Sequence, residues 1–127
     1  LPIDTPWFDL HLRDTGLDPS SATILANALR YFDASSKTFI KSLSLSYNPN
    51  LGDRGASIIA KSLRKNLSEL GMVGCEIGDW GGEVIFQWVE GASNLQMICL
   101  GHNPSSERLK AQFNRLARQR LNTLFVT

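Results

Sequence analysis

The stretch LSLSYNPNLGDRGASIIAKSL, residues 43–63, contains the pattern that decides the fold. It opens with leucines at alternate positions, Leu43 and Leu45, which places both side chains on one face of a strand. Gly52 and Asp53 follow, and after them apolar residues recur at helical spacing. Gly52 permits a tight turn, and the Asp53 carboxylate is suited to the start of a helix. We therefore predict a strand, a turn and a helix within this one stretch.

The same arrangement recurs along the chain. Residues 17–29, 51–63 and 77–89 align without a gap, and each carries apolar residues at offsets 0, 7, 8 and 12. These offsets keep one helical face apolar, and we expect that face to be buried in all three helices. The strand pairs upstream and downstream are Leu10 and Leu12, Leu43 and Leu45, Leu70 and Met72, and Ile98 and Leu100. From one pair to the next the spacing is 33, 27 and 28 residues.

Residues 43–63 and 70–89 resemble leucine-rich repeats, because they follow the pattern L-x-x-L-x-L-x-x-(N/C/T). The unit length is similar to that of the ribonuclease-inhibitor subclass, and the resemblance covers residues 7–104. It implies an α/β leucine-rich-repeat solenoid, with a short curved parallel sheet on the concave side and helices on the convex side. In this family an asparagine at the end of each strand hydrogen-bonds the turn. Cys75 takes that position in the third unit, and we expect it to be structural.

We expect one domain over residues 1–127. Its four repeats are 7–39, 40–66, 67–94 and 95–104, followed by a basic capping helix over 105–121 for which Ser105 or Ser106 serves as N-cap. Residues 33–38 are a polar surplus in the long first unit and are expected to form a surface loop. Residues 1–6 are too short for a cap, and the chain begins at Leu1 and not at Met. We therefore expect it to be part of a longer chain.

The composition excludes several classes of protein. The chain has 127 residues and a formal net charge of +1, and no apolar run is long enough for membrane insertion. The near-neutral charge argues against nucleic acid as the partner. Two cysteines, Cys75 and Cys99, are too few for a disulfide scaffold. We expect an intracellular, cytoplasmic protein, or one delivered into the cytosol of a host cell if it is a bacterial effector.

The residues that often carry chemistry do not form a reactive group here. His11 and His102 are expected three strands apart, about 14 Å, which is too far for a shared metal. Cys99 and His102 are three residues apart on a strand, so their side chains point to opposite faces. The glycine-rich turns at 52–55 and 78–82 lack the spacing of a phosphate loop. We predict no catalytic residue, no metal, no cofactor and no small-molecule substrate, and hence no enzyme.

The alternate strand residues are expected to line the concave face and to bind another protein there. This face is charged in the first repeat, rich in hydroxyl groups in the second, and small and apolar in the last two, where we place the main contact. Trp80 is expected to be exposed, whereas Trp88 suits either a binding anchor or packing between helices. The candidate partner-binding residues are Arg13, Ser44, Ser46, Tyr47, Glu69, Gly71, Val73, Trp80, Met97, Cys99, Gly101 and His102.

The predicted function is that of a protein–protein interaction module that binds, inhibits or senses a partner. The resemblance implies settings such as innate-immune receptors, enzyme inhibitors, cytoskeletal regulators and bacterial effectors. The alternative is the substrate-recognition module of a larger enzyme, such as a ubiquitin-ligase-type protein or a bacterial effector. A third reading uses the basic residues 105–127 to touch nucleic acid or an anionic membrane, and it predicts association that weakens strongly with salt.

Overall fold

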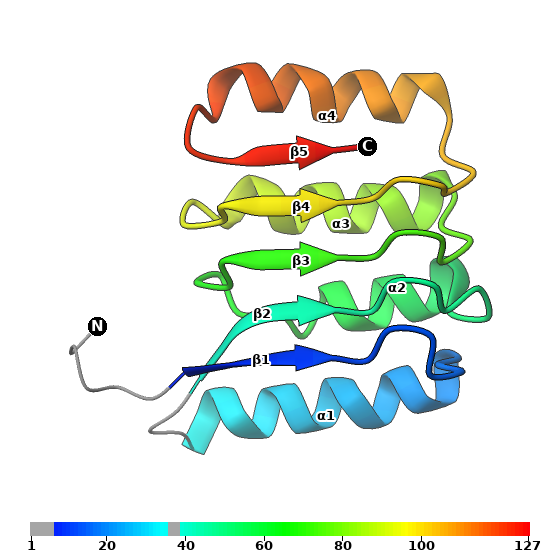
Figure 1. Ribbon diagram of the computed structural model, residues 1–127, viewed down its shortest axis with the longest axis vertical. Helices are drawn as coiled ribbons and strands as arrows, with labels where there is room; N and C mark the ends of the chain where they lie inside the picture. The colour runs from blue at the N-terminus through cyan, green and yellow to red at the C-terminus, as the bar shows by residue number, and fades with distance from the viewer. Residues whose placement is uncertain (1–6, 36–38) are drawn as a thin grey trace.

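The computed structural model describes residues 7–35 and 39–127, in which strands and helices alternate along the chain. Figure 1 shows the strands forming one layer and the helices forming a second layer behind them. The strands are β1 (Trp7–His11), β2 (Phe39–Ser44), β3 (Glu69–Gly71), β4 (Met97–Cys99) and β5 (Leu124–Val126). The helices are α1 (Pro19–Ser35), α2 (Gly52–Ala60), α3 (Asp79–Gly91) and α4 (Glu107–Gln119). The predicted α/β solenoid is therefore confirmed.

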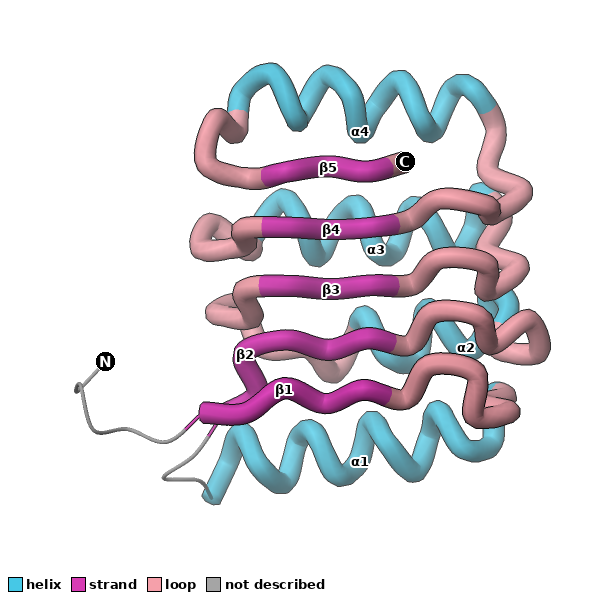
Figure 2. Tube along the Cα trace, viewed as in Figure 1, coloured by secondary structure: helices cyan, strands magenta, loops and turns pink. Residues whose placement is uncertain are grey.

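All strand pairs are parallel, and the strands lie in chain order from β1 to β5 (Figure 2). Parallel neighbours need a crossover, and each helix supplies one. The four predicted strand segments all lie at or beside strands of this sheet. The fifth strand, β5, was not predicted. It pairs with β4 in the register Met97–Leu124 and Cys99–Val126, and so extends the sheet by one strand.

The core lies between the two layers and is made of the repeated apolar positions. Leu43, Leu45, Leu70, Met72 and Ile98 are almost fully buried. The expectation that offset 7 of every helix is buried is wrong for the first repeat, because Ile24 is 71% exposed. Its counterparts, Ile58 and Val84, each pack partly against the core. The difference follows from position, since α1 has a neighbouring helix on one side only, namely α2 (Figure 1).

Asparagine side chains fasten each turn to the next repeat. The Asn48 Oδ1 accepts hydrogen bonds from the backbone N–H groups of Thr15 and Leu17, both at 3.0 Å. The Asn48 Nδ2 donates to the carbonyl groups of Leu12 and Leu45. Asn103 repeats this arrangement on the next turn but one, accepting from the N–H groups of Cys75 and Ile77. These contacts satisfy buried backbone groups that irregular turns would otherwise leave unpaired.

Cys75 occupies the same position in the third repeat, as predicted. Its side chain is fully buried, and its Sγ lies 3.1 Å from the Leu45 carbonyl oxygen, to which it donates. Burial raises the pKa of the Cys75 thiol. Its role is therefore structural, because a buried protonated thiol is a poor nucleophile.

Two of the three aspartates at the helix starts, Asp53 and Asp79, make hydrogen bonds to the following repeat. Asp18 caps its own helix, since its Oδ1 accepts from the Ser21 N–H at 2.9 Å. The Asp53 Oδ1 instead accepts from the N–H groups of Gly78 and Gly81, at 2.7 and 3.0 Å, which belong to the start of α3. Asp79 likewise accepts from the Ser106 N–H, at 2.7 Å, at the start of α4. The Asp53 and Asp79 carboxylates thus oppose the dipole of the following helix as well as that of their own.

The last helix, α4, begins as predicted with Ser106 as N-cap, whose hydroxyl accepts from the Leu109 N–H. Its buried residues are Leu109 and Phe113. The ring of Phe113 lies 5.1 Å from Phe86 of α3 in a T-shaped arrangement, and 6.5 Å from Phe125 of β5. This aromatic row attaches both α4 and β5 to the preceding repeat.

Two further expectations about the first half of the chain have different outcomes. The surface loop predicted over residues 33–38 is wrong for residues 33–35, because α1 continues to Ser35. Residues 36–38 lie outside the described residues, as do residues 1–6, for which the absence of a cap was predicted.

Candidate functional site

The open face of the sheet, on the side away from the helices, is built from alternate strand residues. We call it the strand face. The leucines between these residues point into the core, so the intervening side chains point outward. The register aligns them into two rows across the strands. One row is Asp9, Ser42, Glu69, Met97 and Leu124, and the other is His11, Ser44, Gly71, Cys99 and Val126.

The chemistry of the strand face changes from one end of the sheet to the other. β1 contributes Asp9 and His11, and β2 contributes serines. At the other end, β4 and β5 contribute Met97, Cys99, Leu124 and Val126. Leu124 is 58% exposed and Val126 is 44% exposed. The apolar half of the strand face is therefore larger than the sequence indicated, because β5 adds to it.

Sequence reasoning missed Leu124 and Val126, although a signal was present. The spacing from Met97 to Leu124 is 27 residues, the same as an earlier repeat. Phe125 follows α4 at the position that Ile98 holds after α3. The segment was overlooked because Thr127 stands where the other repeats have a second apolar residue.

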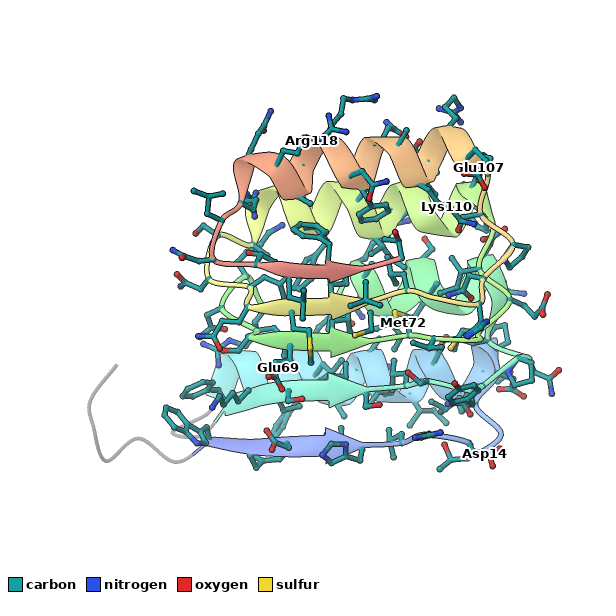
Figure 3. All side chains as sticks on the ribbon, turned by 45° about the horizontal axis from the view of Figure 1, so that its top comes forward. Asp14, Glu69, Met72, Glu107, Lys110 and Arg118 are labelled. Atoms are coloured by element: carbon teal, nitrogen blue, oxygen red, sulfur yellow. The ribbon has the colours of Figure 1, made fainter. Side chains whose placement is uncertain are left out.

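A shallow open hollow of about 410 Å³ occupies the middle of the strand face. Figure 3 shows Glu69 standing on this part of the sheet. Its lining comes from β1, β2, β3 and β4 and from the residues that follow these strands. Most of the candidate partner-binding residues line it: Arg13, Ser44, Ser46, Tyr47, Glu69, Gly71, Val73, Met97 and Cys99.

The other three candidate residues lie elsewhere. Gly101 lies two residues after the end of β4, beside the same surface, and its carbonyl oxygen accepts a hydrogen bond from the Gly74 N–H. His102 lines a separate small hollow together with Leu109 and Phe113. Trp80 is 59% exposed, as predicted, but it lies in the first turn of α3 and hence in the helix layer. Trp80 is therefore not brought together with the strand face, and Trp88 is buried as packing between helices.

Tyr47 is held at the margin of the hollow by a specific backbone conformation. Its φ of 61° is in the left-handed region, as are those of Asp14, Gly74 and His102 at the equivalent position of the other repeats. A non-glycine residue there is strained unless its surroundings hold it. The Arg13 guanidinium lies 4.6 Å from the centroid of the Tyr47 ring, a cation–π arrangement that links the first two repeats.

The thiol of Cys99 is not activated. Partial burial raises its pKa, and the nearby Glu69 carboxylate adds to the rise. A thiol with a raised pKa is mostly protonated at neutral pH and is a poor nucleophile. Both cysteines of the chain are free.

The described residues contain neither a metal-ligand cluster nor a membrane-spanning helix. Within residues 7–35 and 39–127, no group of three or more His, Cys, Asp or Glu side chains is placed to hold a metal ion. In the same residues, none of the helices combines the length and the apolar character that crossing a bilayer requires.

Comparison with known families supports the repeat assignment. The family described as "Leucine Rich repeat" matches residues 36–60, which include β2 and α2. No curated protein matches the chain. With the parallel sheet and the alternating helices, the match supports a leucine-rich-repeat fold, and leucine-rich repeats commonly mediate protein–protein interaction.

Proposed function

We propose that this chain is a non-catalytic binding module that holds a partner protein on the strand face. The observation that carries the proposal is the run of solvent-facing apolar side chains on two neighbouring strands, namely Met97, Cys99, Leu124 and Val126. Contiguous exposed apolar surface of this kind marks interaction sites in proteins. A broad shallow face favours a protein over a small molecule, which needs a concave pocket that encloses it.

The strand face also offers a means of orienting the partner. Glu69 lies beside Met97 in the same row and has a carboxylate at the centre of the hollow. Charged and polar groups around an apolar contact contribute to specificity more than to affinity. The apolar half therefore supplies the main contact, and the polar half formed by β1 and β2 determines how the partner is oriented on the strand face.

The finer assignment is to the ribonuclease-inhibitor-like subclass, acting inside cells. Repeat spacings of 27 and 28 residues, each with a full helix, support this subclass. Two free cysteines are compatible with a reducing compartment. On this proposal the chain inhibits or senses its partner. The alternative, a substrate-recognition module of a larger enzyme, uses the same face to present a substrate to a catalytic domain.

The test places a photo-crosslinking amino acid at position 44, which lines the hollow, or at position 54, an exposed site on α2. In cells of the protein's own source, we expect a discrete protein adduct from position 44 and none from position 54. Adding Val73→Arg or Met97→Arg to the chain with the position-44 probe is expected to abolish that adduct. Both variants should unfold in urea at the wild-type midpoint, since both side chains face the hollow.

Equal adducts from positions 44 and 54 would contradict the proposal. So would an adduct that survives both arginine substitutions in a folded chain. Once the partner is purified, its affinity is expected to fall at least tenfold with Val73→Arg, because a charge is then placed in the apolar contact.

A further inference from the structure

The charges of the molecule are separated between two edges of the sheet. All strands run in the same direction and all helices return in the opposite one, so the strand starts share one edge with the helix ends (Figure 1). We call this edge the strand-start edge. Figure 3 shows the same order along α4, where Glu107 and Arg118 lie toward opposite ends. The strand-start edge carries the basic residues Lys41, Lys61, Arg64, Lys65, Arg118 and Arg120, and its carboxylates include Glu69 at the start of β3 and Glu90 in the last turn of α3.

The opposite edge largely neutralises its own cations. Arg108 pairs with Asp79 and Glu83, each at 3.6 Å, and Lys110 pairs with Glu107 at 3.7 Å. At the strand-start edge, no such pair engages Lys41, Lys61 or Lys65 within the part of the chain that is described. The formal net charge of +1 therefore conceals a basic edge, and it is a poor guide to which anions this edge attracts.

A second hollow, of about 350 Å³, lies on this edge at the starts of β1 and β2 and the loops before β3 and β4. It is separate from the hollow on the strand face. Its lining combines aromatic rings, an ammonium group, amides and a hydroxyl, and includes no carboxylate. The lining residues are Trp7, Phe39, Lys41, Asn66, Ser68, Asn94 and Gln96.

The aromatic part of this hollow is held in place while remaining open. Trp7 is 55% exposed, and its ring meets Phe39 edge-on, with the ring centroids 5.9 Å apart. The Lys41 Nζ lies over the Trp7 ring, 5.0 Å from its centroid. An exposed indole beside a cation provides both a stacking surface and a phosphate contact.

The polar part is anchored by backbone hydrogen bonds that continue the sheet. The Ser68 N–H donates to the Lys41 carbonyl at 2.9 Å, and the Gln96 N–H donates to the Ser68 carbonyl at 2.7 Å. The Asn66 Oδ1 is buried and accepts no hydrogen bond. A buried acceptor without a donor is costly.

We propose that this second hollow binds an unpaired nucleotide of a single-stranded nucleic acid. The base stacks on Trp7 and meets the amides of Asn66, Asn94 and Gln96, while Lys41 contacts its phosphate. Lys61 and Lys65, on the loop that contains Asn66, line a different hollow against α3 and contribute only to the positive charge of this edge. Stacking on aromatic rings and hydrogen bonding to base edges are the usual means of recognising single strands.

Two other anionic ligands fit this hollow less well. An acidic peptide is attracted by the same lysines, but it makes no use of an open indole ring. An anionic membrane surface favours apolar side chains at the point of contact, whereas Asn66, Ser68, Asn94 and Gln96 surround Trp7. The proposal is independent of the strand face, because the two hollows share no lining residue.

The test measures the fluorescence anisotropy of a labelled ten-nucleotide oligouridine with the full chain at low and physiological salt. Trp7→Ala is expected to weaken binding roughly tenfold through loss of stacking. Trp7→Phe should retain most of the affinity. The matched control, Trp80→Ala, removes an equally exposed tryptophan from α3 and should leave the affinity within about twofold of wild type. Lys41→Gln should reduce the salt dependence, and Arg54→Gln should not.

Urea unfolding of Trp7→Ala establishes that the variant is folded before its affinity is compared. The proposal is overturned if the wild-type chain does not bind the oligonucleotide, or if folded Trp7→Ala binds it as tightly as wild type. It is equally overturned if polyglutamate or phosphatidylserine vesicles bind as tightly as the oligonucleotide and are unaffected by Trp7→Ala. In that event the edge attracts anions in general and does not recognise a base.

Discussion

Asn48 is the residue that best explains how neighbouring repeats are joined. Its carboxamide makes hydrogen bonds to the backbone of Leu12, Thr15, Leu17 and Leu45, and its side chain is fully buried. An amide is required because one end of the group must accept and the other must donate. Glutamine carries the same carboxamide group, but its side chain is longer by one methylene.

We predict that Asn48→Ala lowers the free energy of unfolding by about 3 kcal/mol, because several hydrogen bonds are lost and backbone groups are left buried without partners. Urea denaturation followed by circular dichroism measures the change. Asn94→Ala, which removes an exposed amide, is the control and should change stability by less than about 0.5 kcal/mol. A loss below about 1 kcal/mol for Asn48→Ala would show that water replaces the amide.

At the residue scale, the resemblance implied the role of the strand-end asparagine and of Cys75 correctly, and Ser106 was one of the two N-cap candidates. The left-handed conformation of Tyr47 was not foreseen. Tyrosine has no preference for positive φ, and the requirement appears only when the four equivalent turns are compared. The exposure of Trp80 was predicted correctly, whereas its distance from the strand face became clear only in the folded chain.

At the scale of elements, the distance between α2 and α3 depends on Gly81. A Cβ at this position would lie 2.7 Å from the Asp53 Oδ1 and 2.8 Å from its Cα. The second of these is a backbone atom, so the clash cannot be relieved by a side-chain rotation. Gly81 therefore lets the start of α3 approach Asp53 closely enough for its N–H to donate to the carboxylate.

Gly81→Ala is expected to destabilise the protein by about 1–2 kcal/mol. The added methyl group pushes α3 away from α2, and this strain is larger than the gain from the better helix propensity of alanine. Gly101→Ala is the matched control, since its added Cβ would meet no atom within 4 Å. Its unfolding midpoint should stay within error of the wild type. An unchanged midpoint for Gly81→Ala would mean that the two helices are free to shift.

The elements that the sequence did not predict lie where the repeat pattern weakens. β5 is followed by a polar residue, Thr127, at the second apolar position, so the repeat pattern is incomplete there. The end of α1 contains serine, alanine and aspartate, a composition that suits a loop as well as a helix. Periodicity identifies long elements with a clear apolar face and loses accuracy where that face ends.

For the whole molecule, the position of a repeat in the array decides which of its residues are buried. Ile24 and Ile58 hold the same offset in α1 and α2. Ile58 packs against the core, whereas Ile24 is largely exposed. A stacked array buries a residue only if a neighbour covers it, so equivalent residues contribute differently to stability.

Ile24→Asn is accordingly expected to change the free energy of unfolding by no more than about 0.5 kcal/mol, and Ile58→Asn to lower it by about 2 kcal/mol or more. The two variants introduce the same chemical change, so each serves as the control for the other in urea unfolding. Similar losses from both would show that the outer face of α1 is covered in solution.

The candidate site was predictable in outline at this scale. The alternation of strand residues identified the face, and the change from charged to apolar residues located its apolar half. The contribution of β5 and the hollow around Trp7 were not predicted, because both depend on loops and edges that meet only in the folded chain. Net charge does not show how basic and acidic residues are distributed between the two edges.

The carboxylates that cap the following helix have a consequence for how the molecule comes apart. Asp53 completes the start of α3, and Asp79 completes the start of α4, so these two helices depend on the unit before them. In nearest-neighbour models, part of the free energy that stabilises these helices therefore belongs to the interface between units and not to the unit itself. The repeats are therefore not interchangeable cassettes. Excising one would weaken its successor, and unfolding is expected to spread across the array as a single cooperative event.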